Sequence, residues 1–245
     1  MSTKGMLAAA AGATLLALAA MATVALAATI IGTNGDDQLV GTPANDRIAA
    51  LGGNDTVRAL AGNDRVRAGK GDDGVAAGHG RDRVAGGPGN DDLGGGPGSD
   101  RMRGGPGDDR LMAGDDRSSR GADRLFGGAD DDLLYGHRGI DVLVAGTGHD
   151  GVRGGDGPDL IRIGSPRDLA AASAAADTAG VDDRAAGGDG PDRIGARDGL
   201  LDEISCGRGR DVAILDSLDV IVDADEQNPN GSCERVRRAD PAPGA

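Results

Sequence analysis

Aspartates that recur every nine residues are the side chains with the clearest potential for chemistry. From Gly32 the chain divides into nonapeptides, and residues 32–112 contain nine of them without a gap. The fourth residue is Gly in eight of the nine units, with Ala44 as the exception. The sixth residue is always Asp, at Asp37, Asp46, Asp55, Asp64, Asp73, Asp82, Asp91, Asp100 and Asp109. Short carboxylates in Gly-rich turns that expose backbone carbonyls supply the oxygens that calcium takes in sets of about six to eight.

The pattern continues beyond residue 112 with interruptions. One unit with five extra residues covers 113–126, and four clean units cover 127–162. An Ala-rich stretch at 163–186 precedes a further clean unit at 187–195, and weaker units follow around Asp202 and Asp211. Most of the chain is therefore copies of one short unit, as expected for a solenoid.

The elements that must position these aspartates are very short strands. The eighth residue of every one of the nine units is Leu, Ile, Val or Met, so the last three residues alternate outward, inward and outward. Gly in the first six residues permits the positive φ of a tight turn. A three-residue strand is unstable alone, but stacked copies bury the apolar residues and bring successive turns together. The prediction is an all-β solenoid in which cations between stacked turns neutralise facing carboxylates.

An arginine column indicates two units per turn. Arg47, Arg65, Arg83 and Arg101 occupy the seventh place in alternate units, 18 residues apart. An 18-residue turn would align them on one outer face about 4.8 Å apart. Two interpretations stay open: an anion-binding stripe, or a solvated face that balances nearby Asp and prevents stacking of sheets.

These units resemble the calcium-binding nonapeptide repeats of the RTX, or hemolysin-type, family. The resemblance covers about 32–162 and 187–214, and implies a parallel β-roll with calcium held between loops one turn apart. We expect the first loops, with Asp37 and Asp46, to be incomplete, and the Ala-Leu openings at residues 50–67 to weaken calcium binding there. With loop carbonyls assisting, the resemblance implies as metal ligands Asp55, Asp64, Asp73, Asp82, Asp91, Asp100, Asp109, Asp123, Asp132, Asp141, Asp150, Asp159 and Asp192.

Composition excludes several other classes. The 245 residues include 46 Gly but one Phe, one Tyr and no Trp, so no ordinary large core is expected. Of 40 acidic residues only three are Glu, and the formal net charge of −14 disfavours nucleic acid binding. The sequence contains no His-Glu-x-x-His, Gly-x-Ser-x-Gly or Walker motif. Asp pairs such as Asp72 and Asp73 could act as acid and base, but their recurrence favours ligands, and we predict that the protein is not an enzyme.

The two ends of the chain differ from the repeats. Residues 1–27 are typical of a secretory signal peptide cleaved after Ala27, with an uncleaved membrane anchor as the alternative, and the repeats follow at 28–162. In an exported protein Cys206 and Cys233 are expected to form a disulfide, although a redox or metal thiol pair is the alternative. The apolar stretch 211–222 predicts one or two longer strands that cap the solenoid within a degenerate region at 187–234. We expect a disordered tail at 235–245.

Together these features predict a secreted calcium-binding repeat protein, a parallel β-roll with a disulfide-stapled C-terminal cap, which folds as calcium binds. The alternative is an extracellular adhesion or interaction module that uses the roll as a scaffold, with a cell-surface protein or polysaccharide as partner. After signal cleavage no segment could span a membrane.

Overall fold

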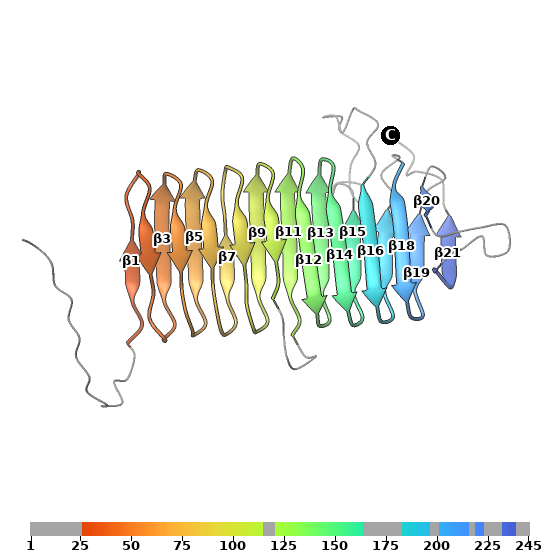
Figure 1. The fold of residues 1–245 in the computed structure, drawn as a ribbon, viewed down its shortest axis with the longest axis horizontal. Coiled ribbons are helices and arrows are strands. Elements are labelled where there is room, and N and C mark those ends of the chain that lie inside the picture. Colours follow the sequence, from red (N-terminus) through yellow and green to blue (C-terminus); the bar gives the residue numbers. More distant parts are fainter. Residues whose placement is uncertain are drawn as a thin grey trace, which may run out of the picture.

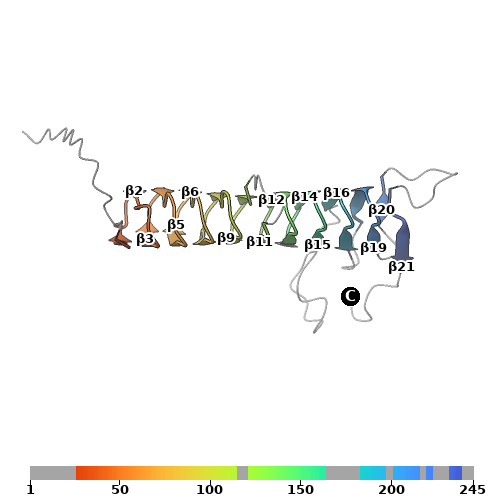
Figure 2. The ribbon, with the colours of Figure 1, turned by 90° about the horizontal axis from the view of Figure 1, so that it is seen from below.

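The protein is a flattened solenoid of two parallel sheets. The computed structural model describes residues 26–114, 121–163, 183–196, 201–215, 219–222 and 232–238, and every regular element within them is a strand. Consecutive strands alternate between the sheets, and Figures 1 and 2 show the strands stacked along one axis in two thin layers. No described helix is long and apolar enough to cross a membrane.

Each sheet contains every second strand of the chain. The eleven-stranded sheet, here the odd sheet, consists of β1 (Thr29–Ile31), β3 (Arg47–Gly52), β5 (Arg65–Lys70), β7 (Arg83–Ala85), β9 (Arg101–Pro106), β11 (Arg124–Ala129), β13 (Val142–Thr147), β15 (Leu160–Ile163), β17 (Arg193–Ala196), β19 (Val212–Leu215) and β21 (Arg235–Arg238). The ten-stranded sheet, here the even sheet, consists of β2 (Gln38–Val40), β4 (Thr56–Arg58), β6 (Gly74–Ala76), β8 (Asp92–Gly94), β10 (Arg110–Met112), β12 (Leu133–Arg138), β14 (Gly151–Asp156), β16 (Arg184–Asp189), β18 (Glu203–Arg208) and β20 (Val220–Ile221).

The strand register confirms two nonapeptides per turn. Most partners are 18 residues apart, as Ile48 and Val66 are in β3 and β5. The separation grows to 23 residues between β9 and β11 and to 33 between β15 and β17, yet the eighth-place residues still pair. The extra residues therefore leave the register of the described strands unchanged.

The core is the column of eighth-place residues between the sheets. Their side chains are buried in every turn from β3 to β20: Ile48, Val57, Val66, Val75, Val84, Leu93, Met102, Leu111, Leu125, Leu134, Leu143, Val152, Ile161, Ala185, Ile194, Ile204, Ala213 and Ile221. Phe126 and Tyr135 stand at the ninth place and are only partly buried. Neither aromatic side chain belongs to the buried column.

The repeat extends further than the sequence pattern predicts. It resumes at Asp183 rather than at residue 187, because Ala185 fills the eighth place of a unit that an aliphatic pattern misses. The predicted tail is wrong at its start, since Arg235–Arg238 pair with β19 as β21. The stretch 211–222 contains two short strands, one in each sheet, instead of longer capping strands. Residues 1–25, 164–182 and 239–245 lie outside the described residues, and with them most of the predicted signal peptide, insertion and tail.

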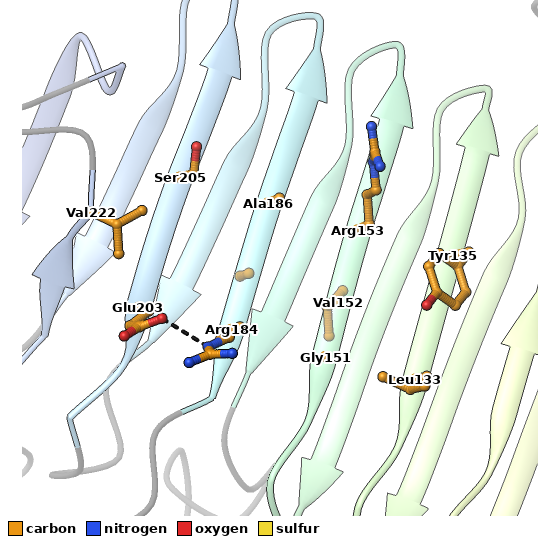
Figure 3. A pocket seen from close by; sticks show the side chains of 11 residues that line it. Leu133, Tyr135, Gly151, Val152, Arg153, Arg184, Ala186, Glu203, Ser205 and Val222 are labelled. Atoms are coloured by element: carbon orange, nitrogen blue, oxygen red, sulfur yellow. Dashed lines mark hydrogen bonds and ion pairs between the residues drawn. The ribbon is translucent and has the colours of Figure 1, made fainter.

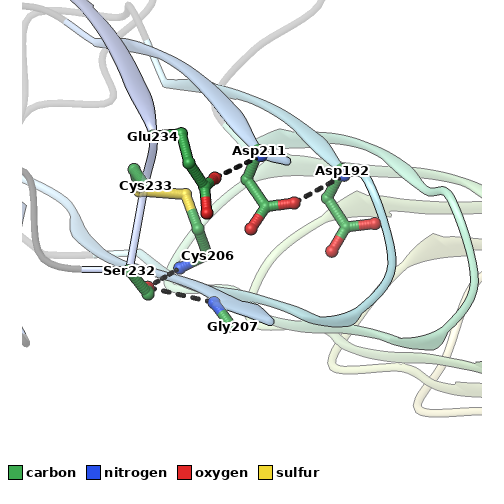
Figure 4. The surroundings of a disulfide bond; sticks show 7 residues. All are labelled: Asp192, Cys206, Gly207, Asp211, Ser232, Cys233 and Glu234. Atoms are coloured by element: carbon green, nitrogen blue, oxygen red, sulfur yellow. Dashed lines mark hydrogen bonds between the residues drawn. A yellow bond between two sulfur atoms is a disulfide. The ribbon is translucent and has the colours of Figure 1, made fainter. Parts of the chain in front are cut away.

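A disulfide closes the C-terminal end of the roll, as predicted. Cys206 in β18 is bonded to Cys233, with their Cα atoms 5.2 Å apart. The hydroxyl oxygen of Ser232 accepts hydrogen bonds from the amides of Cys206 and Gly207 (Figure 4). The disulfide thus attaches residues 232–238 to the final turns of the described stack.

Candidate metal centre

The place-six aspartates form one column along each edge of the roll. One column precedes the strands of the even sheet and runs from Asp37 to Asp219; the other precedes the odd sheet and runs from Asp46 to Asp211. All thirteen predicted ligands belong to these columns, and each is no more than 3% exposed. Carboxylates are seldom buried so completely unless they are paired or bind a cation.

Within each column, every aspartate orients its neighbour. The amide of Asp91 donates to Oδ1 of Asp109 in the next turn at 2.8 Å, and the amide of Asp109 donates to Oδ1 of Asp132 at 2.9 Å. The same bond recurs between successive turns along both columns, including from Asp192 to Asp211. One oxygen of each carboxylate is therefore held by the backbone of the preceding turn, and this fixes the direction of the other.

The second oxygen, Oδ2, has no hydrogen-bond partner among the described residues in ten of these side chains: Asp55, Asp64, Asp73, Asp82, Asp91, Asp109, Asp132, Asp159, Asp192 and Asp211. A buried carboxylate oxygen without a donor costs the fold free energy, since water is lost and nothing replaces it. Recurrence in turn after turn indicates a common missing partner, and a hard cation fits an oxygen that no N–H or O–H reaches.

Backbone carbonyls at the fourth place complete the candidate ligand set. No described residue donates a hydrogen bond to the carbonyl of Gly53, Gly62 or Gly71. The reason lies at the fifth place, where the side-chain oxygen of Asn63 accepts the amide of Arg81 from the next turn at 2.8 Å. Asn and Asp side chains at this place thus take the amide that could otherwise occupy the carbonyl.

In one turn the fifth residue has no side-chain hydrogen-bond acceptor, and the amide of the next turn bonds to the fourth-place carbonyl instead. There Ala122 offers no side-chain acceptor, and the amide of Ile140 donates to the carbonyl of Gly121 at 3.0 Å. That carbonyl is occupied where its counterparts in other turns are open. The fifth place therefore influences which carbonyls can serve a cation, a role that the sequence analysis missed.

Glycine is required where the turns touch. A Cβ added to Gly80, whose φ is +136°, would lie 1.7 Å from the carbonyl oxygen of Gly62 in the preceding turn. A Cβ on Gly104 would lie 2.0 Å from Oδ2 of Asp109 in the same unit. The second of these contacts shows that Oδ2 is directed into the turn rather than toward solvent.

The units that open with Ala-Leu keep this loop geometry. Leu51 and Leu60 stand at the second place with φ values of 85° and 84°, the left-handed region that Gly normally occupies. The carboxylates of Asp55 and Asp64 are as buried as in the other turns. The departure from the Gly-Gly opening therefore leaves the carboxylates in place, at the cost of backbone strain.

Burial perturbs these carboxyl groups strongly. Removal from water, followed by the charges of neighbouring carboxylates, raises the pKa of Asp91 to about 7 and that of Asp132 to about 8. The same causes raise the pKa of Asp109 to about 6 and that of Asp159 to about 8. At neutral pH the fold therefore disfavours the charged carboxylates unless a cation compensates them.

In the first two loops, the carboxylates of Asp37 and Asp46 accept hydrogen bonds from a threonine of the same loop. Oδ2 of Asp37 accepts hydrogen bonds from the amide and the hydroxyl of Thr33, and Thr42 donates the same pair to Asp46. Burial raises the pKa of Asp46, but hydrogen bonds from Ala28 and Thr42 outweigh it and hold the pKa below its ordinary value. The carboxylates of these two loops therefore already have hydrogen-bond donors and do not require a cation.

Several acidic residues in the columns escaped the predicted ligand set. Asp183, Asp202, Asp211 and Asp219 are buried in line with the others. At the end of the odd-sheet column, Oε2 of Glu234 accepts the amide of Asp211 at 2.6 Å (Figure 4). Glu234 stands at the sixth place of the last unit. The only feature of the sequence that could have identified it is a carboxylate, longer than Asp, at that place in the motif.

Side chains alone do not assemble a conventional metal site. Among the described residues no group of three His, Cys, Asp or Glu side chains converges on one point. Any cation held in the turns must therefore take most of its oxygens from the backbone, with the place-six carboxylates supplying the charge. Calcium accepts such mixed oxygen sets, whereas zinc favours imidazole and thiolate ligands.

The outer faces carry two shallow grooves. One, of about 280 Å³, lies on the even sheet over the small residues Gly151 and Ala186, beside the ring of Tyr135 (Figure 3). Arg184 and Glu203 form an ion pair of 2.8 Å at its side. The other, of about 330 Å³, lies at the edge of the odd sheet among Arg81, Arg83, Arg101 and Arg124.

Comparisons with known proteins agree with this geometry. The family model of the RTX calcium-binding nonapeptide repeat matches residues 31–66, 58–93, 94–117, 117–143 and 126–161, together more than half of the 245 residues. A search of curated proteins finds no match. The matched segments coincide with the turns whose aspartates are stacked, and the chain belongs to the family of RTX calcium-binding nonapeptide-repeat proteins.

Proposed function

We propose that the protein is secreted, binds calcium in the turns of both edges and folds its β-roll as the ions bind. The observation that carries the proposal is the recurring buried Oδ2 without a hydrogen-bond donor, in ten turns of the two columns. The proposed ligands are the thirteen predicted aspartates, with Asp211 added because its carboxylate has the same surroundings. When bound, calcium supplies positive charge that offsets the buried carboxylates.

The chain's own residues prepare each site. An amide from the preceding turn fixes Oδ1, and the absence of a Cβ at Gly104 leaves room for Oδ2 of Asp109 beside it. Side chains at the fifth place, such as Asn63, leave carbonyls such as that of Gly62 without an amide donor. Because a turn provides ligands only when it is stacked, ion binding and ordering of the roll should occur together.

Secretion and the absence of catalysis are further parts of the proposal. The signal-like segment at 1–27, the Cys206–Cys233 disulfide and the frequent export of RTX proteins support an extracellular location. The histidines give no support for an enzyme: the Nδ1 of His149 lies 3.1 Å from Asp131 in an exposed turn, far from any nucleophile pattern.

A calcium titration of the chain from residue 28 onward tests the proposal. Circular dichroism should change from a disordered to a β-rich spectrum as calcium reaches roughly 10⁻⁴–10⁻³ M, the range of extracellular calcium modules. Isothermal calorimetry should give a stoichiometry of several ions per chain over the same range. Magnesium, which demands a rigid octahedral site, should not replace calcium. A β-rich spectrum that is unchanged by chelator would contradict coupled folding, and the absence of saturable binding would contradict the sites.

A further inference from the structure

The odd sheet carries an uninterrupted row of arginines on its outer face. Arg47, Arg65, Arg83, Arg101 and Arg124 are direct neighbours on β3, β5, β7, β9 and β11. All five side chains are exposed. Strand spacing places them about 4.8 Å apart, so the row spans about 19 Å. We call these five residues the arginine row.

No described carboxylate lies within ion-pair distance of any side chain in the arginine row. Like charges directly opposite each other on neighbouring strands are destabilising. Arg67 and Arg103 add two more cations to the same face, and the guanidinium groups of Arg101 and Arg103 lie over the ring of Phe126 at 5.2 and 5.6 Å. The face thus concentrates positive charge in a protein whose formal net charge is −14.

The even sheet shows that this chain can pair its arginines. Neighbouring strands there hold the ion pairs Arg138–Asp156 at 3.3 Å, Arg184–Glu203 at 2.8 Å and Arg208–Asp189 at 3.8 Å (Figure 3 shows the second). If arginines served only to balance nearby acids or to keep sheets apart, the same cross-strand pairing would suit the odd sheet. A row without carboxylates points instead to an anionic partner.

The turns beside the arginine row form a groove and add a further arginine to the basic surface. The groove of about 330 Å³ at this edge is lined by Arg83, Arg101 and Arg124 from the row, and by Arg81, Ser99 and Ala122 from the adjoining turns. Asp82 and Asp100 also line it, but both side chains are buried, so the exposed charges of the groove are the guanidinium groups. Arg81 follows Asn45 and Asn63 in the fifth-place column of this edge and adds a cation there. Guanidinium groups and a hydroxyl on one wall give donors for carboxylate or sulfate oxygens.

We propose that the arginine row and its groove bind one extended chain of an acidic polysaccharide, bearing carboxylate or sulfate groups along its length. The row is linear, and only every second residue of the ninth-place column beside it is a cation, because Ala49 and Ala85 alternate there with Arg67 and Arg103. A polysaccharide carries its anionic groups at intervals of about one sugar, which is close to the spacing between strands. Successive groups can therefore meet successive arginines.

Other polyanions fit the surface less well. Single-stranded nucleic acid is normally held by several stacked aromatic side chains, and Phe126 is the only aromatic residue on this face. A duplex or an anionic membrane would extend beyond the row to the edge that precedes the even sheet, where the exposed carboxylates of Asp72, Asp108 and Asp131 would repel it. A single flexible chain avoids this edge.

The test measures binding of dextran sulfate to the calcium-loaded chain, with uncharged dextran as the matched polymer. The variant R65E/R83E/R101E reverses the centre of the row, and the control R58E/R110E/R153E makes the same charge change on the exposed outer face of the even sheet. We expect the row variant to bind roughly tenfold more weakly or worse, the control to change less than about threefold, and dextran not to bind. Circular dichroism in calcium reports folding separately, so a failure of the calcium proposal would be recognised independently.

Other outcomes would overturn the proposal. Equal loss in the two triple variants would show an effect of net charge alone. Tighter binding of oligothymidylate or of phosphatidylglycerol vesicles than of dextran sulfate would assign the face to nucleic acid or membrane. If the charge reversals prevent folding, R65Q/R83Q/R101Q against R58Q/R110Q/R153Q gives the same comparison with smaller perturbation, and equal affinities there would also refute the proposal.

Discussion

Replacing two stacked aspartates by asparagine should have opposite effects with and without calcium. Asp109 and Asp132 follow one another in the even-sheet column, and neither Oδ2 has a hydrogen-bond partner among the described residues. The double variant D109N/D132N keeps the Oδ1 acceptors and removes both charges. A matched control exists in the adjacent residues, because Asp108 and Asp131 are exposed and accept amides through Oδ1 in the same turns.

The magnitude follows from the pKa values. Burial, followed by neighbouring charges, raises the pKa of Asp109 from 3.8 to about 6 and that of Asp132 to about 8. At about 1.4 kcal/mol per unit, full ionisation costs the fold roughly 3 and 6 kcal/mol, an upper limit because the two charges interact. We expect D109N/D132N to favour folding in calcium-free buffer near pH 8 by about 2 kcal/mol or more. D108N/D131N should favour folding much less, because the Asp108 charge is only one of the neighbouring charges that raise the pKa values of Asp109 and Asp132.

The pH dependence of folding in calcium-free buffer tests this prediction, because the raised pKa values fix its direction. A raised carboxyl pKa means that the folded chain binds more protons than the unfolded chain above about pH 4, so the free energy of unfolding falls as pH rises. In calcium-free buffer, acidification toward about pH 5 should therefore promote the β-rich spectrum, and the gain should be lost between about pH 6 and 8. D109N/D132N should move the midpoint of this loss to higher pH.

Calcium reverses the order of the variants. Because two proposed ligands are lost, D109N/D132N should need about tenfold more calcium than D108N/D131N to reach half-maximal folding at neutral pH. An unchanged calcium midpoint would refute the assignment of these carboxylates as ligands. If D109N/D132N is less folded than D108N/D131N in calcium-free buffer, the inference that the buried charges destabilise the fold is refuted.

Three further sets of substitutions test the packing of the turns and the C-terminal end. Gly80→Ala should lower the free energy of unfolding in calcium by more than about 2 kcal/mol, because its Cβ would strike a stacked carbonyl, whereas Gly74→Ala, with its nearest neighbour at 3.9 Å, should be neutral in urea unfolding. Leu51→Gly and Leu60→Gly should each raise the free energy of unfolding in calcium by about 1 kcal/mol, because left-handed backbone strain is relieved and both side chains are exposed. A decrease in this free energy would show that the leucine side chains contribute packing. Replacing both cysteines by serine should cost about 3 kcal/mol, and an unchanged urea midpoint would show that the staple adds nothing.

The repeat made much of this fold predictable. In a solenoid each unit contacts only its neighbours, so a nine-residue pattern specifies the strand, the turn and the buried column at once. The 18-residue spacing of Arg47 and Arg65 predicted the pairing of β3 with β5, and the 13 aspartates that were selected all lie in the two buried columns. No long-range contact had to be inferred beyond one turn.

Units whose chemistry differs from the pattern were harder to predict. Ala185 is small for an eighth-place residue, and Glu234 replaces Asp before β21, so the matching units fall below any threshold that separates signal from chance. The hydrogen bonds from Thr42 to Asp46 depend on how a hydroxyl folds back within one turn. Such local contacts are decided by geometry, which residue types alone do not specify.

The proposed calcium sites would couple the two charged features of the roll. The columns bury 18 aspartates at the edges, whereas the arginine row stands exposed on one face. Without cation or protons, the edges would repel an anionic chain that approaches the row. Calcium in the turns would both stack the strands that align the arginines and cancel the negative charge flanking them. A polysaccharide site on this face would therefore exist only in the calcium-loaded protein, which makes extracellular calcium the condition for binding as well as for folding.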